Sequence, residues 1–81
     1  LVPQAAMSFR GRVVIRFNVH RNGYITDLQV LQPASIPALT NAALNALRLS
    51  NPTAALPPEY PADKVLFTVT FYYNEDPRSS P

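Results

Sequence analysis

The chain has 81 residues, of which 47% are apolar and 15% charged, and this is the composition of one small globular domain with a modest core. Its net charge of +2 is too small to indicate a nucleic-acid partner by itself, and the absence of cysteine excludes disulfides and thiolate metal sites. No apolar run approaches the roughly 20 residues that cross a bilayer, and no signal-like segment opens the chain.

The first residues predict a short N-terminal helix. Because the chain opens with Leu1 rather than Met, we expect a piece of a longer protein, with any anchor or targeting segment outside it. Pro3 is tolerated in a first helical turn, and Gln4 to Phe9 suit one or two turns of helix. Gly11 ends this segment.

Two strands follow, over Arg12 to Arg21 and over about Tyr24 to Gln32. Apart from Val14, the first alternates between apolar and polar residues, which is typical of a strand with one buried face. Its inward face is formed by Val13, Ile15, Phe17 and Val19. Its outward face carries Arg12, Arg16, Asn18 and His20.

The dipeptide Asn22-Gly23 predicts a tight hairpin between these strands, because both central residues of a type I′ turn need positive φ. A two-residue loop sets Phe17 against Leu28 and Ile15 against Val30, so that inward residues face each other. A three-residue loop with a bulge would pair residues of opposite faces. The pattern therefore favours the two-residue turn.

An amphipathic helix is predicted from Ile36 to about Ser50. Ser35 is the expected N-cap, and Pro37 in the first turn loses no hydrogen bond that the helix needs. The helix ends at Asn51-Pro52, since a residue before proline is pushed out of the α region. The residues expected on its apolar arc are Ile36, Leu39, Ala42, Ala43, Ala46 and Leu47.

The remainder of the chain is a proline-stiffened loop followed by a last strand, from Val65 to about Asn74. We expect residues 1–76 to form a single domain and residues 77–81 to form a flexible tail. The predicted fold is α+β, with a three-stranded antiparallel sheet in the order 2-1-3, one long helix packed on one face and the short N-terminal helix.

The last strand is the candidate binding site. From Leu66 to Asn74 it contains no charge, proline or glycine, whereas the second strand carries Asp27 and stops at Pro33. An unprotected edge is a template for an added strand, so we expect a partner peptide to pair there. The alternative is that the tail or the N-terminal helix covers this edge. The predicted partner-binding residues are Val65, Leu66, Phe67, Thr68, Val69, Thr70, Phe71, Tyr72 and Tyr73.

No arrangement of residues indicates catalysis, and no cofactor or metal is expected. As a general base His20 would need an orienting carboxylate, and Asp27 lies across the hairpin at a diagonal at best, so His20 is interpreted as a solvated surface residue. Glu75-Asp76 follows the last strand, without a rigid frame that would pair the two carboxylates, and is interpreted as solubilising charge. The bases of single-stranded RNA could stack on Arg12, Arg16 and Tyr72 on the outward face. Binding of the phosphates would need a larger basic patch, so nucleic-acid binding is the weakest hypothesis.

Taken in order, these elements resemble the C-terminal periplasmic domain of TonB, in the wider TonB/TolA group, over about residues 2 to 74. The resemblance rests on a Pro-x-x-Ala element, a glycine before the first strand, a glycine turn, a helix of the form Leu-x-x-x-Ala-Leu-x-Ala and a loop that contains proline. The matching residues are Pro3, Ala6, Gly11, Val13, Ile15, Phe17, Val19, Gly23, Ile25, Leu28, Val30, Leu39, Ala43, Leu44, Ala46, Pro52, Leu56 and Pro57.

The resemblance implies a non-catalytic periplasmic domain whose partner is the TonB box, a peptide of an outer-membrane transporter, added beside the last strand. It also implies a preceding inner-membrane helix and proline-rich spacer, through which proton-driven inner-membrane motor proteins supply energy for uptake. The alternatives are a TolA-like envelope-structure domain and a self-associating module in which the same edge makes a homodimer.

Overall fold

The structure is a computed structural model, and it describes residues 10–74. The predicted helix over Gln4 to Phe9, the boundary after residue 76 and the tail at residues 77–81 lie outside these residues.

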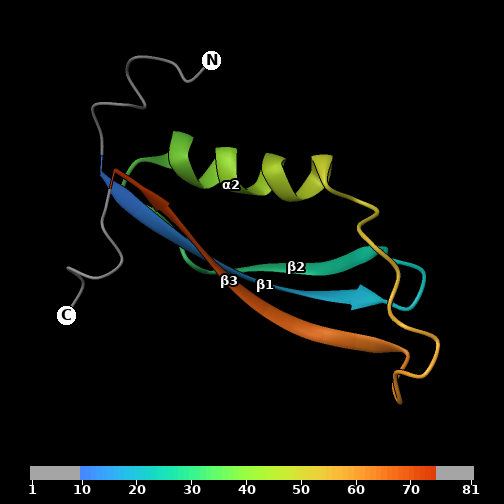
Figure 1. Cartoon of the computed structure of the whole chain (residues 1–81). Coiled ribbons are helices and arrows are strands. Elements are labelled where there is room, and N and C mark those ends of the chain that lie inside the picture. The colour runs from blue at the N-terminus through green and yellow to red at the C-terminus, as the bar shows by residue number, and fades with distance from the viewer. Residues whose placement is uncertain (1–9, 75–81) are drawn as a thin grey trace.

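Three strands and one helix make up the described fold (Figure 1). They are β1 (Gly11–His20), β2 (Ile25–Gln32), α2 (Pro37–Leu49) and β3 (Lys64–Tyr73). The sheet is antiparallel with the order β2-β1-β3, and α2 lies across one of its faces. The α+β class, the strand order and the single covering helix are therefore as the sequence predicted.

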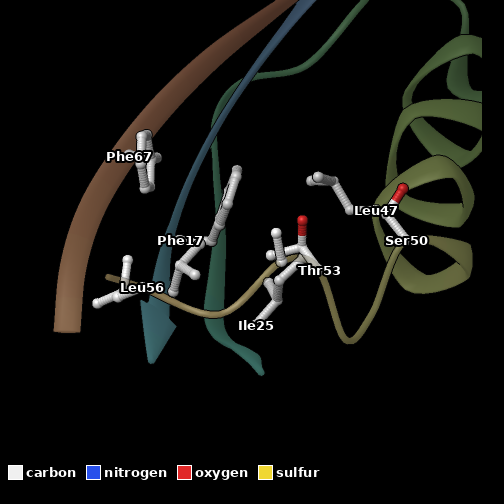
Figure 2. A pocket seen from close by; sticks show the side chains of 9 residues that line it. Phe17, Ile25, Leu47, Ser50, Thr53, Leu56 and Phe67 are labelled. Atoms are coloured by element: carbon white, nitrogen blue, oxygen red, sulfur yellow. The ribbon is translucent and has the colours of Figure 1, made fainter. Parts of the chain in front are cut away.

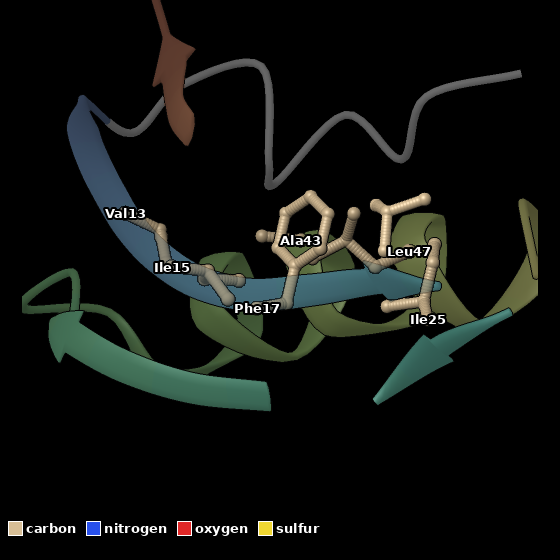
Figure 3. Close-up of a cluster of buried hydrophobic side chains, with 7 residues drawn as sticks. Val13, Ile15, Phe17, Ile25, Ala43 and Leu47 are labelled. Carbon is tan, nitrogen blue, oxygen red and sulfur yellow. The ribbon is translucent and has the colours of Figure 1, made fainter. Parts of the chain in front are cut away.

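The core lies between the inward face of β1 and one stripe of α2 (Figure 3). Val13 and Ile15 are fully buried, and they pack on the helix where Ala43 allows a close approach. The alternation predicted for β1 is confirmed, because its inward residues are all buried: Val13, Ile15, Phe17 and Val19.

The buried stripe of α2 is narrower than the sequence predicted. Leu39, Ala43 and Leu47 are buried, at successive turns of one helical face, whereas Ala42 and Ala46 are exposed. The helix packs mainly against the single central strand, so this row is fully covered and Leu44 beside it is only partly buried.

The start of α2 differs from the predicted cap. Ser35 is not the N-cap; Ile36 is, with φ of −98° and ψ of 112° and no side-chain hydrogen bond. The cause is Pro37, which takes the first helical turn and holds the residue before it in an extended conformation. Thr40 stabilises the entry instead, because its hydroxyl accepts a 3.0 Å hydrogen bond from the Ala34 amide.

The hairpin between β1 and β2 has a three-residue loop, so the predicted two-residue turn is wrong. The His20 amide donates to the Tyr24 carbonyl at 2.8 Å, which leaves Arg21, Asn22 and Gly23 in the loop. The faces are not mixed, because the register shifts by one residue between Arg16 and Asn18.

The register shift is a bulge in β2 at Asp27, whose φ is +58°. After the bulge Ile15 faces Val30, as the sequence predicted, whereas Phe17 does not form the expected direct pair with Leu28. The bulge thus restores the inward alternation that the longer loop would otherwise have broken.

Gly23 combines a positive φ of +92° with a close approach to the loop after α2. A Cβ at this position would clash with the Thr53 carbonyl oxygen.

We expect Gly23→Ala to lower the free energy of unfolding by at least about 2 kcal/mol, measured by urea denaturation. Gly11→Ala is the control, because its Cβ would lie 3.3 Å from Leu39 Cδ1 without positive φ. Equal losses in the two variants would contradict this account.

Asp27 gives the hairpin a pH dependence. Hydrogen bonds from the Asn18 amide and the Thr26 hydroxyl, both 2.9 Å, lower the pKa of Asp27 below its usual 3.8. Its stabilising effect is therefore present above pH 3.8 and is lost as the pH falls through the lowered pKa.

We expect the stability difference between the wild type and Asp27→Asn to shrink on acidification below pH 3.8. A carboxyl pKa of 3.8 or higher in an NMR titration would refute this.

Candidate functional site: the outer edge of β3

β3 is a regular edge strand. All ten of its residues pair with β1, from Gly11↔Tyr73 to His20↔Lys64, without a register shift. Within residues 10–74 no strand pairs with its other side (Figure 1). The described fold therefore presents an uninterrupted row of main-chain groups along this edge.

The hydrogen bonds at the hairpin determine which amides of β3 point outward. The His20 amide donates to Tyr24, toward β2, and the next amide, that of Arg21, donates to the Asp63 carbonyl at 2.8 Å, toward β3. Successive residues of a strand bond on opposite sides, so the odd-numbered residues of β1 and β3 bond to one another. The main-chain groups that point to the free edge are those of Leu66, Thr68, Thr70 and Tyr72.

All of the predicted partner-binding residues, Val65 to Tyr73, lie on this strand. Several of their apolar side chains are exposed: Leu66 by 59%, Phe67 by 42% and Tyr72 by 39%. Lys64 at the start of β3 is charged, but from Val65 to Tyr73 the strand lacks the charges, prolines and bulges that keep most edge strands from pairing.

The opposite edge, formed by β2, is protected. Its pairing with β1 is interrupted by register shifts at two places, and one of them holds the charged Asp27 in the left-handed conformation. Bulges twist an edge away from the flat geometry that an added strand needs. Of the two edges, β3 is therefore the one suited to accept a partner.

The outward face of the sheet is polar, and its side chains contact one another. The Arg16 guanidinium donates to Gln29 Oε1 at 2.7 Å, and the Arg12 guanidinium lies 5.7 Å from the centre of the Tyr72 ring. The His20 ring contacts the Thr26 hydroxyl at 2.6 Å. Among the described residues there is no group of three or more potential metal ligands, and no helix is long and apolar enough to cross a membrane.

Arg21 ties the loop before β3 to the hairpin. Its guanidinium donates to the carbonyl oxygens of Pro57, Pro58, Tyr60 and Ala62, at 3.4, 3.3, 2.8 and 2.7 Å respectively. The ion pair with Asp63 is long, at 3.6 Å, and that carboxylate is 97% exposed, so the carbonyl contacts are the stronger restraint. The loop thus enters β3 from a fixed position.

An open apolar pocket of about 300 Å³ lies beside the start of β3, at the end of α2 (Figure 2). Its walls come from all three strands, from the helix and from the loop after the helix. The lining residues are Phe17, Val19, Ile25, Leu47, Ser50, Thr53, Ala54, Leu56 and Phe67.

The sequence profile described as "Gram-negative bacterial TonB protein C-terminal" matches residues 3–74, which is most of the chain and includes every strand and the helix. This chain belongs to the TonB C-terminal domain family. Searches of curated proteins and of solved structures return no match.

Membership of the TonB C-terminal family establishes the general role of the domain. The family consists of non-catalytic, periplasmic protein-interaction domains that take part in energy transduction to outer-membrane transporters, and it implies binding of the transporters' TonB boxes. The edge of β3, uncharged from Val65 to Tyr73, is of the kind that such an interaction requires.

Sequence reasoning did not find Arg21 or the pocket as features of the site. In the sequence Arg21 is only the polar residue at the end of a strand. The carbonyl oxygens that it contacts lie more than 30 residues later, in a loop. The pocket depends on where that loop packs against the hairpin end of the sheet. The density of prolines in residues 52–61 was the one available signal, since it indicates an ordered loop.

We expect Arg21→Lys to lower the free energy of unfolding by about 1–3 kcal/mol, because a single ammonium cannot reach the carbonyl groups that the planar guanidinium spans. Urea denaturation measures the loss. Arg48→Lys is the control, because Arg48 is exposed and makes one 3.3 Å hydrogen bond to Asn45. If both variants are as stable as the wild type, Arg21 does not anchor the loop.

Proposed function

We propose that this domain binds the TonB box of an outer-membrane transporter as an added strand along the outer edge of β3, through residues Val65–Tyr73. The observation that carries the proposal is the unbroken register of β3 on β1 combined with its unpaired outer side in the described fold. Main-chain groups that point outward at every second residue are the complement of an extended peptide.

The proposal extends to energy transmission for uptake. A strand pulled along its own axis loads many ladder hydrogen bonds together, so such an interface resists force better than one side-chain contact. We propose that this domain is periplasmic and is joined to the inner membrane by a segment that precedes Leu1. Through that segment, proton-driven inner-membrane motor proteins would supply the energy. Family membership supports this step, and the geometry of β3 is compatible with it.

A second candidate uses the same edge. The β3 strands of two copies can pair antiparallel about a two-fold axis, which would make a homodimer and fit a TolA-like envelope-structure role. The absence of charge between Val65 and Tyr73 favours this candidate as well, because no like charges would meet across the axis. The two candidates differ in whether a transporter peptide or a second copy occupies the edge.

Thr70→Pro tests the edge directly. The Thr70 amide points away from β1, so proline removes an outward donor while the ladder with β1 keeps its hydrogen bonds. We expect the affinity for a synthetic TonB-box peptide, measured by calorimetry, to fall at least about tenfold with the fold retained. Thr70→Ala keeps the amide and should bind as the wild type does.

Val69→Pro provides a contrast, because the Val69 amide points toward β1 and its loss should unfold the domain. Amide shifts from labelled protein should concentrate at Leu66, Thr68, Thr70 and Tyr72 when peptide is added. Unchanged affinity in a folded Thr70→Pro variant would refute strand addition. Broadening of the same amides with protein concentration, without any response to peptide, would favour the homodimer.

A further inference from the structure

We infer that the pocket at the end of α2 is a specificity pocket, which receives one apolar side chain of the peptide bound along β3. This inference rests on the proposed function, because the occupant is a residue of the added strand. It goes further in assigning sequence selectivity to a defined place in the fold and in stating the chemistry selected, an aliphatic or aromatic side chain.

Phe67 makes the pocket continuous with the binding edge. It belongs to β3 and lines the pocket, and it stacks on Phe17 with ring centres 6.1 Å apart. Its 42% exposure leaves part of its ring open to a neighbour. Side chains directly opposite in adjacent strands stand about 5 Å apart, so a peptide residue across from Phe67 on the helix side would lie at the pocket rim.

The chemistry of the walls selects an apolar occupant. Phe17, Val19, Ile25 and Leu47 are buried apolar residues, and no charged residue lines the pocket. A charged side chain placed there would lose its hydration without gaining a partner. The volume of about 300 Å³ exceeds the roughly 150 Å³ that accommodates benzene in a protein interior, so one large apolar side chain fits.

The loop side of the pocket is held in place before any ligand binds. The Thr53 amide donates to the Gly23 carbonyl at 2.8 Å, and the Leu56 amide donates to the Arg21 carbonyl at 3.0 Å. The Asn51 side chain is also bonded to both main-chain groups of Ile25, at 2.9 and 3.0 Å. A wall restrained in this way loses little conformational entropy when a side chain enters.

Ala54→Leu tests the pocket by filling it. Ala54 lines the pocket but is exposed, so a larger side chain there occupies the space without disturbing the core. Ala55→Leu is the matched control, since Ala55 is an equally exposed neighbour that does not line the pocket. The unfolding midpoints of both variants, measured in urea, should equal that of the wild type.

The readout is an alanine scan of a synthetic TonB-box peptide against the wild type and both variants. We expect one apolar peptide position at which alanine weakens binding about tenfold or more to the wild type and to Ala55→Leu, but has little effect with Ala54→Leu. Shifts of the outward amides of β3 should persist with every variant, because the main-chain ladder is unaffected.

Two outcomes would overturn the inference and are distinguishable. If the peptide shifts the β3 amides but Ala54→Leu binds every peptide as the wild type does, the pocket has no role and strand addition stands. If the peptide neither binds nor shifts the β3 amides of the wild type, the proposed function fails and the specificity pocket fails with it.

Discussion

The antiparallel pairing of β1 with β3 is the interaction on which both the core and the proposed binding edge depend. β1 supplies the buried face beneath α2 and pairs with β3 at ten positions, and its odd-numbered residues form the hydrogen bonds of that ladder. Because main-chain direction alternates along a strand, this pairing leaves the even-numbered amides of β3 facing outward. A bulge in this pair would change which amides are presented. The regularity of the ladder, which has no register shift, is therefore part of the site.

The sequence predicts those parts of the fold that depend on alternation and on chain order. Strand β1, the helix and the order 2-1-3 follow from apolar patterns and the rule for crossovers. The hairpin detail does not follow, because Asn22-Gly23 suits a two-residue or a three-residue loop, and the choice depends on whether Asp27 accepts a left-handed conformation. The structure combines a three-residue loop with a compensating bulge in β2. A rule that treats the loop and the strand separately cannot find that combination.

The candidate site likewise has one part that the sequence predicts and another part that it does not. The edge was predictable, because Val65 to Tyr73 lacks every protective residue that Asp27 and Pro33 give to the other edge. Arg21 and the pocket were not, because each arises from contacts between the hairpin and a loop more than 30 residues later. No periodic pattern in the sequence predicts where a proline-rich loop packs against a sheet. Local sequence thus predicts which edge is open to an added strand, whereas the pocket that we propose for peptide selection depends on tertiary contacts.

In the proposed complex, the main-chain ladder would supply affinity and the pocket would supply selectivity. In that complex, main-chain hydrogen bonds along β3 would accept any extended peptide and, loaded together, would suit the transmission of force. Discrimination then requires a feature that reads a side chain, and the pocket beside Phe67 is placed for it at one end of the edge. The loop that forms its wall is bonded to Arg21 and Gly23, at the same end of the sheet where β3 begins. Tension along β3 would therefore act on a wall that is already anchored to the hairpin, so the selective contact can persist while the ladder carries the load.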